Sequence, residues 1–185
     1  MHTDVIYRLH DALPKIRDWI DQLLEAHWER ARPIASLGFS RLASYYPPEV
    51  LASANVVSVD RTPFPPVALF GLRELASHAE LQFGGITFKN TFFIARGAET
   101  EALCFHELVH VIQWARLGVD RFLLAYALGL VRDGYEGSPL EMMAYCLQHR
   151  FERGDELKEL VQNINESTDT IWAETATLLS GAVSP

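Results

Sequence analysis

The stretch His106-Glu107-Leu108-Val109-His110 lies inside an apolar run from about Glu99 to Leu117, and the rest of the chain is best interpreted outward from it. The run has the length and character of a buried helix. At about 3.6 residues per turn, histidines four positions apart fall on one helix face, so both imidazole rings can reach the same metal ion. Glu107 lies about 100° round the helix, where its carboxylate can reach a metal-bound water without becoming a ligand. One helical turn therefore predicts two metal ligands and a base.

The neighbours of this motif strengthen the prediction. They are large and apolar: Leu103, Phe105, Leu108, Val109, Val111, Ile112 and Trp114. Two histidines and a glutamate buried among such residues each carry a desolvation cost, and a bound metal ion offsets that cost. The alternative is a pair of core histidines with other hydrogen-bond partners, together with a Glu107 that forms a surface salt bridge.

A catalytic zinc site normally has three protein ligands and one position for water, so a third ligand must come from another segment. A third histidine six positions after His110 is excluded, because Arg116 stands there. The acidic and histidine candidates further along the chain are Asp133, Glu136, Glu141, His149 and Glu152. We favour Glu141, because it falls in the first turn of a predicted helix that carries Ala144 and Tyr145 on its inward side.

The sequence leaves one specific alternative for Glu141. Ser138, Pro139 and Glu141 have the spacing of a helix N-terminus, with serine as the N-cap, proline at the first helical position and glutamate three residues after the cap. In that arrangement, Glu141 forms a capping box with Ser138 and binds no metal. Glu136, in the loop before this helix, is the next candidate ligand.

A family resemblance rests on these residues and on those around them. The shared pattern is His106-Glu107-Leu-Val-His110-Val-Ile-Gln113-Trp, then Leu117-Gly118, Phe122, Tyr126, Tyr135 and Pro139-Leu140-Glu141-Met-Met-Ala144-Tyr145. Over roughly residues 54–151, the chain resembles small bacterial gluzincin-type domains of the zincin superfamily, which are zinc metallopeptidase domains. The resemblance implies that Glu141 is the third zinc ligand and that an edge strand lines the substrate cleft.

Two positions depart from the pattern of these families. Thermolysin-like gluzincins carry an aspartate four residues after the ligand glutamate, where it orients a histidine, and here that position is Tyr145. Ser138 stands where the small domains commonly have an asparagine. Metal-bound histidines normally need a partner for their second ring nitrogen, and the sequence assigns none.

The reaction implied by the resemblance is hydrolysis of a peptide bond in a peptide or protein substrate. His106, His110 and Glu141 would hold Zn²⁺, and Glu107 would act as the general base toward a metal-activated water. Three side chains remain candidates for stabilising the oxyanion: Tyr135, Tyr145 and His149. We expect the peptide to lie extended along an edge strand within residues 86–94.

Two other hypotheses use the same residues differently. One is a zincin-like fold that serves as a catalytically silent or self-restrained binding or regulatory module, with the N-terminal helices covering the cleft. The other is a helical interaction protein without metal. In that case, replacing the two histidines of the motif changes stability no more than ordinary core substitutions do.

The composition is that of an ordinary globular chain, with 49% hydrophobic and 22% charged residues among 185, and we expect a single domain over residues 1–185. A formal net charge of −8 and no Lys/Arg-rich run argue against nucleic acid as a partner. The longest apolar stretch, residues 122–131, is too short to span a bilayer. No secretory leader is visible at the N-terminus, so we expect cytoplasmic residence. We expect Cys104 and Cys146 to be reduced core thiols.

The predicted fold class is α+β, a mostly helical, minimal zincin-like domain with a small antiparallel sheet before the motif helix. Helical periodicity over residues 4–31 predicts an N-terminal helical extension, residues 1–48, which Pro14 divides into a short and a longer helix. A further short helix is expected within residues 33–46. Residues 55–60 alternate as a strand does, residues 69–78 fit a helix, and residues 86–94 fit a β-hairpin that turns at Lys89-Asn90.

The second half of the chain is predicted to be helical. Gly118 is expected to end the motif helix, and residues 119–131 fit a core helix. A loop over residues 134–137 leads to the helix that starts at Ser138-Pro139 and runs to about Arg153. These elements complete a metal-binding core over residues 54–153, and a C-terminal helix follows over residues 155–180.

Overall fold

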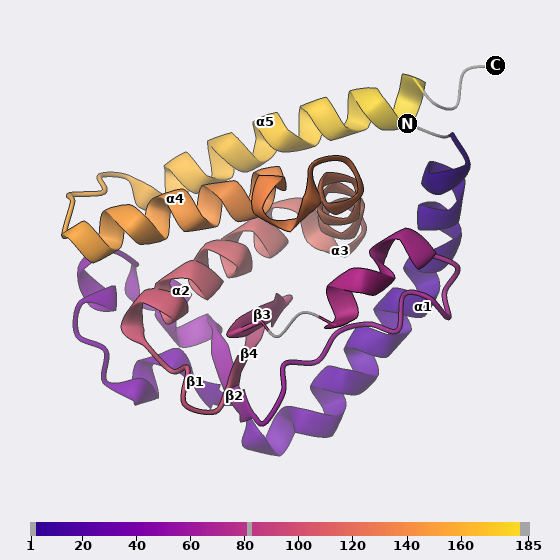
Figure 1. The fold of residues 1–185 in the computed structure, drawn as a ribbon. Helices are drawn as coiled ribbons and strands as arrows, with labels where there is room; N and C mark the ends of the chain where they lie inside the picture. Colours follow the sequence, from indigo (N-terminus) through magenta and orange to yellow (C-terminus); the bar gives the residue numbers. More distant parts are fainter. Residues whose placement is uncertain (1–2, 81–82, 182–185) are drawn as a thin grey trace.

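The computed structural model describes residues 3–80 and 83–181, and it confirms the mostly helical α+β class (Figure 1). The α-helices of this part are α1 (Thr3–His27), α2 (Pro48–Ser53), α3 (Glu101–Gly137), α4 (Pro139–Arg153) and α5 (Leu160–Gly181). The strands are β1 (Arg32–Pro33), β2 (Asn55–Val59), β3 (Gly85–Phe88) and β4 (Thr91–Ala95). Short 3-10 helices span Trp28–Arg30, Ile34–Leu37, Leu42–Ser44 and Arg73–Glu80.

The four strands form one sheet in the order β1-β2-β4-β3. The β3–β4 hairpin is as predicted, with Phe88 opposite Thr91 and a two-residue turn in which Lys89 has φ 57°. The prediction of an antiparallel sheet was wrong in one respect, because β2 and β4 are parallel. The hairpin reverses the chain between β3 and β4, and β2 pairs with β4 across a connection long enough for a parallel crossover.

Alternating side chains of the strands pack on opposite faces of the sheet. Val57 and Phe93 belong to the hydrophobic cluster that α1 supplies with residues such as Ile20. Phe92 and its neighbours on the other face belong to the cluster that includes Phe105 of α3. The sheet therefore lies between Ile20 of α1 and Phe105 of the motif helix, as the period of two along a strand requires.

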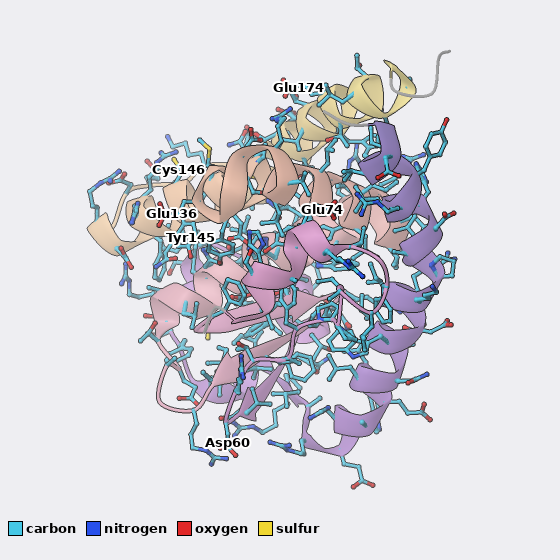
Figure 2. All side chains as sticks on the ribbon, turned by 45° about the vertical axis from the view of Figure 1, so that its right-hand side comes forward. Asp60, Glu74, Glu136, Tyr145, Cys146 and Glu174 are labelled. Atoms are coloured by element: carbon cyan, nitrogen blue, oxygen red, sulfur yellow. The ribbon has the colours of Figure 1, made fainter. Side chains whose placement is uncertain are left out.

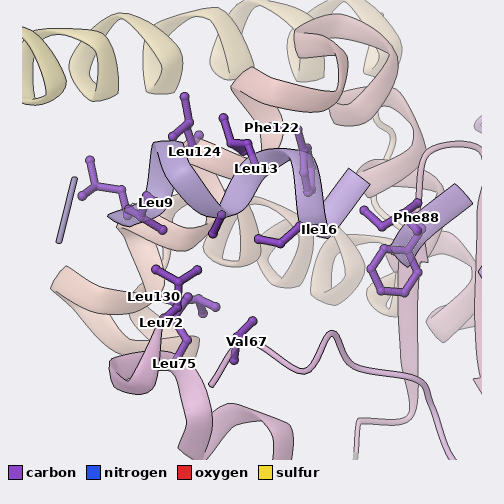
Figure 3. Packing of buried hydrophobic residues seen from close by; sticks show 14 of the residues in the cluster. Leu9, Leu13, Ile16, Val67, Leu72, Leu75, Phe88, Phe122, Leu124 and Leu130 are labelled. Atoms are coloured by element: carbon purple, nitrogen blue, oxygen red, sulfur yellow. The ribbon is translucent and has the colours of Figure 1, made fainter. Parts of the chain in front are cut away.

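Helix α1 continues through Pro14, so the predicted division into two helices was wrong. Its buried residues lie on one face on both sides of the proline: Ile6, Leu9, Leu13, Ile16 and Ile20. A proline inside a helix costs about 3 kcal/mol, whereas burying each large aliphatic side chain contributes about 1.5–3 kcal/mol. Figure 3 shows Leu13 beside Phe122 and Leu124 of α3, and Leu9 and Ile16 belong to the same cluster. The free energy gained by burying these side chains along one continuous helix therefore exceeds the cost of the proline.

Three other predicted elements differ from the structure. Within residues 33–46 there are two 3-10 helices rather than one helix, and Gly38 follows the first of them at φ 71°. The predicted helix over residues 69–78 is the 3-10 helix Arg73–Glu80. Residues 155–159 precede the C-terminal helix, because α5 begins at Leu160 after Glu159 at φ 52°. Backbone at positive φ is incompatible with a right-handed helix, so such residues mark its ends.

Helix α3 consists of segments joined at two glycines. Thr100 is the N-cap, and its side chain accepts a hydrogen bond from the backbone N–H of Leu103 at 3.1 Å. Gly118 has φ 71° and ψ 174°, so the motif helix ends where predicted and the chain turns into a second, largely buried segment. Gly134, at φ 74°, makes the second break, and residues 135–137 return to helical geometry rather than forming the predicted loop. Figure 1 shows α4 and α5 running alongside one another above the motif helix.

The two cysteines lie in different environments. Cys104 is buried, and burial raises the pKa of its thiol to about 12. Cys146 is exposed, so the prediction of two core thiols was wrong for this residue. The buried side of α4 is formed by Leu140, Glu141, Ala144 and Phe151, and Cys146 lies about 200° round the helix from Ala144. Among the described helices, none is long and apolar enough to cross a membrane.

Candidate metal centre

The motif helix brings His106, Glu107 and His110 into the interior of the protein. Their exposed fractions are 3%, 2% and 5%. The Nε2 atoms of the two histidines lie 3.0 Å apart, so both rings point at one location as the four-residue spacing predicts. The alternative of Glu107 in a surface salt bridge is therefore wrong.

Glu141 of α4 completes this group from across the core. It is 3% exposed, its Oε2 atom lies 3.3 Å from Nε2 of His106, and its Oε1 atom lies 3.4 Å from Nε2 of His110. Ser138 is the N-cap residue of α4, yet its side chain forms no capping hydrogen bond, so the alternative role of Glu141 in a capping box is not the one that the structure has. Residues 138 and 139 instead pack against Gly129 of α3, where a Cβ atom would lie 3.1 Å from Cδ of Pro139. This close packing brings the first turn of α4 against α3.

The remaining candidate ligands lie at the surface. Asp133, Glu136, His149 and Glu152 are all exposed. Within the described part of the chain, the group of histidine and acidic residues that could hold a metal ion consists of His106, His110 and Glu141. The structure thus brings together the three predicted ligands and leaves the reserve candidate Glu136 outside the group.

The geometry of the three donors fits a tetrahedral zinc ion. Ligand atoms at about 2.0–2.1 Å from a tetrahedral zinc are separated from one another by about 3.3 Å. In the structure, the three donor atoms are separated by 3.0, 3.3 and 3.4 Å. Two imidazoles and one carboxylate form a donor set that zinc prefers.

The charges of the three side chains are coupled to one another. Burial alone would raise the pKa of Glu141, but His110 and His106 outweigh burial and hold this pKa well below its usual range. Burial alone would lower the pKa of His110, but the Glu141 carboxylate outweighs burial and raises this pKa to about 9. The carboxylate therefore stays ionised in the interior, where an anion requires a positive partner.

Two further side chains hold the ligands in place. The Nδ1 atom of His110 lies 2.8 Å from Oε1 of Gln113, and the amide N–H of Gln113 donates to the carbonyl oxygen of Leu140 at 3.1 Å. The hydroxyl of Tyr126 donates to Oε1 of Glu141 at 2.6 Å. Such contacts fix the orientation of metal ligands. His110 thus has the partner that the sequence did not assign.

The sequence gives a signal for the contact of Gln113 with His110 but none for the contact of Tyr126 with Glu141. Gln113 stands three residues after His110, which places it on the same helix face. That spacing is a usable signal, and our prediction missed it. Tyr126 belongs to the family pattern and to a segment predicted as a core helix, but nothing local in the sequence indicates its contact with Glu141. The ring of His106 packs at 4.5 Å against the ring of Tyr145, and its buried Nδ1 atom has no hydrogen-bond partner among the described residues.

Glu107 is fixed between α3 and the edge strand. The hydroxyl of Thr87 donates to Oε2 of Glu107 at 2.6 Å. On the other side, Gly85 lies so close that a Cβ atom there would be 2.9 Å from Cδ of Glu107. Burial raises the pKa of Glu107, more than the nearby histidines lower it. A carboxyl group with a raised pKa is well suited to accept and return a proton near neutral pH.

The metal group lies where a groove meets a cavity. The groove, of about 610 Å³, is lined by residues such as Phe83, Gly85, Glu136 and Tyr145. Figure 2 shows Glu136 and Tyr145 on the same side of the molecule. The cavity is apolar, and His106 and Glu107 line both spaces. Residues 3–48 contribute Ile16 to the cavity but no residue to the groove, so the N-terminal helix packs behind the centre and leaves the groove uncovered.

The sheet has β1 at one edge and β3 at the other, and β4 lies inside the sheet between β2 and β3. Within residues 86–94, β4 therefore offers no free edge, and the edge strand along which we expect the peptide to lie is β3. The edge of β3 is also partly occupied, because the indole N–H of Trp114 donates to the carbonyl oxygen of Thr87 at 3.2 Å. Gly85, at the other end of the strand, lines the groove.

No protein-family model, curated protein or solved structure matches this chain. The resemblance to gluzincin-type domains therefore stands on the motif residues themselves.

Proposed function

We propose that the protein is a zinc-dependent metallopeptidase. The observation that carries the proposal is the convergence of His106, His110 and Glu141, three buried donors from two helices whose separations fit one tetrahedral zinc ion. The open groove beside them supports it, because a substrate needs a path to the centre. A bound zinc ion supplies a Lewis acid and lowers the pKa of a bound water to about 7.

Glu107 is proposed as the general base. Its carboxylate lines the groove next to His106 and is no member of the donor group. Thr87 holds Oε2 of Glu107 by a hydrogen bond, which restricts the side chain to one orientation. With its raised pKa, Glu107 accepts the proton of the attacking water and delivers it to the leaving amine.

Tyr135 is proposed to stabilise the oxyanion, with Tyr145 as its partner. Tyr135 lines both the groove and the cavity, and its hydroxyl lies 3.3 Å from that of Tyr145. Burial, reinforced by Glu141, raises the pKa of Tyr135, so its hydroxyl keeps the proton it must donate. The third sequence candidate, His149, is exposed and lines neither space.

The test is cleavage of an unfolded protein by the zinc-loaded enzyme, read as new peptide termini by mass spectrometry. We expect cleavage by the wild type and a loss of about 100-fold to 10,000-fold in the Glu107→Gln variant, with its zinc retained. Glu152→Gln, the same substitution at an exposed position of α4, serves as the control and should cleave normally. Zinc-loaded wild type that cleaves nothing would contradict the proposal and favour a metal-binding regulatory module.

A further inference from the structure

The cavity beside the metal centre is built almost entirely of apolar side chains. Five segments of the chain contribute to it, with apolar lining residues that include Ile16, Val67, Leu72, Leu75, Ile86 and Leu130. Figure 3 shows Ile16, Val67 and Leu72 around one interior region. Among the described lining residues, the polar side chains belong to the three proposed metal ligands and to Glu107, Thr87, Trp114, Tyr126 and Tyr135. A charged or amide group placed deep in this cavity would lack partners.

The size of the cavity limits what it can hold. Its volume is about 80 Å³. An engineered cavity of about 150 Å³ binds benzene and stays dry, so roughly half that volume suits about three or four carbon atoms. That is an aliphatic side chain rather than an aromatic one. Each methylene group of the bound side chain that is buried in the cavity should increase the affinity about fourfold.

The main chain of an extended substrate has a different path. The carbonyl oxygen of Gly84 accepts a hydrogen bond from the backbone N–H of Ala95, so the backbone groups of Gly85 and Thr87 face away from β4. Trp114 already uses the carbonyl oxygen of Thr87. The backbone edge of β3 is thus occupied by Trp114 at Thr87. At Gly85, the same edge faces the groove. The chain can lie in the groove while a single side chain enters the cavity.

We propose that this cavity is the specificity pocket of the site and takes one aliphatic side chain, such as that of valine, leucine, isoleucine or methionine, from the residue next to the scissile bond. This inference rests on the proposed peptidase function and adds the class of substrate. The metal centre lies at the junction of groove and cavity, so the side chain and the reacting carbonyl are positioned together.

The test measures binding to the zinc-loaded protein by calorimetry, with simple hydroxamates that differ only in the group next to the zinc-binding carbonyl. The three groups are methyl, isobutyl and naphthylmethyl. We expect the isobutyl compound to bind about 50-fold more tightly than the methyl compound, from three additional buried carbons. The naphthylmethyl compound should bind no more tightly than the methyl compound, because it exceeds the cavity.

The matched variants reduce the volume of the cavity by enlarging one of its lining side chains. Ala127 lines the cavity and is half-buried. Ala127→Leu should reduce isobutyl binding to the level of methyl binding measured in the same variant, and the smaller Ala127→Val should give an intermediate loss if the leucine variant does not fold. Ala173→Leu adds the same side chain at an exposed position of α5 and should change nothing.

The outcomes separate this inference from the function on which it rests. Equal binding of the methyl and isobutyl compounds, or a persistent isobutyl preference in Ala127→Leu, would overturn the pocket assignment alone. Tightest binding by the naphthylmethyl compound would also overturn it. If none of the hydroxamates binds the zinc-loaded protein, both the pocket and the peptidase proposal fall.

Discussion

Gly85 and Glu107 lie so close together that a Cβ atom on Gly85 would be 2.9 Å from Cδ of Glu107. Side chains do not approach one another so closely, and the carboxylate is fixed on its other side by Thr87. Any side chain at position 85 must therefore displace the proposed base. We expect Gly85→Ala to reduce kcat for peptide hydrolysis by at least about tenfold, because small displacements of a catalytic group are costly. Zinc content should not change.

A matched control is available at the preceding residue. A Cβ atom on Gly84 would lie 3.4 Å from Cδ2 of Leu103, which is close to an ordinary contact, and it does not approach Glu107. Gly84→Ala should thus hydrolyse peptides at nearly the wild-type rate. Equal losses in the two variants would show that the strand, rather than the position of Glu107, is responsible.

Gln113 is expected to control zinc affinity through His110. Gln113→Leu removes the acceptor for Nδ1 of His110 and should weaken zinc binding about 10-fold to 100-fold. Gln113→Glu keeps an oxygen at that place and should bind zinc within a fewfold of wild type. Competition with a chromogenic chelator gives both dissociation constants, and identical losses in the two variants would contradict the role of the oxygen.

Tyr126 is expected to orient the third ligand. Its hydroxyl donates to Oε1 of Glu141, and hydrogen bonds to charged groups are stronger than those between neutral groups. Tyr126→Phe should weaken zinc binding by about tenfold with the fold intact. Tyr145→Phe removes a hydroxyl that lies near Tyr135 instead, so its zinc affinity should remain that of wild type. Unchanged affinity in Tyr126→Phe would contradict the proposed role.

Because Tyr46 is buried, we expect the free energy of unfolding to fall with pH in alkaline solution. Its hydroxyl donates to the carbonyl oxygen of Phe105, beside the motif, at 2.9 Å, and burial raises its pKa well above the usual 10. The unfolded chain then loses this proton first. The contribution of the protonated Tyr46 to stability is complete below about pH 10. As the pH rises above 10, the free energy of unfolding falls by up to about 1.4 kcal/mol per pH unit.

The corresponding measurement is urea denaturation of wild type and Tyr46→Phe between pH 8 and pH 11. The variant should be less stable by about 1 kcal/mol at pH 8, where only the hydrogen bond is lost. Above pH 10 its free energy of unfolding should fall less steeply than that of wild type. Parallel curves above pH 10 would show that Tyr46 ionises equally in both states.

The local patterns predicted much of this molecule. The spacing of His106 and His110 fixed their shared helix face, and the turn at Lys89 and the break at Gly118 lie where the sequence indicated. Each of these features depends on a few neighbouring residues, so the chain itself carries the information. Pro14 is the exception, because tertiary packing of α1 overrides its local preference.

The candidate site was predictable only in part, for a related reason. Glu141 has the same spacing from Ser138 whether it caps α4 or faces His106, and only the approach of α4 to Gly129 decides between these roles. The contact of Tyr126 with Glu141 and the apolar cavity likewise arise where distant segments meet. Such contacts depend on tertiary packing, and the periodicity of a single segment does not encode them.

The most direct test of the metal centre is elemental analysis of protein purified without chelator and then loaded with zinc. The variants are His110→Ala, Glu141→Ala and Glu107→Gln, each checked for folding by circular dichroism. The proposed ligand set predicts one zinc ion per chain in wild type and in Glu107→Gln, and none in the other two. Wild type without zinc after loading, or Glu141→Ala with its full zinc content, would contradict it.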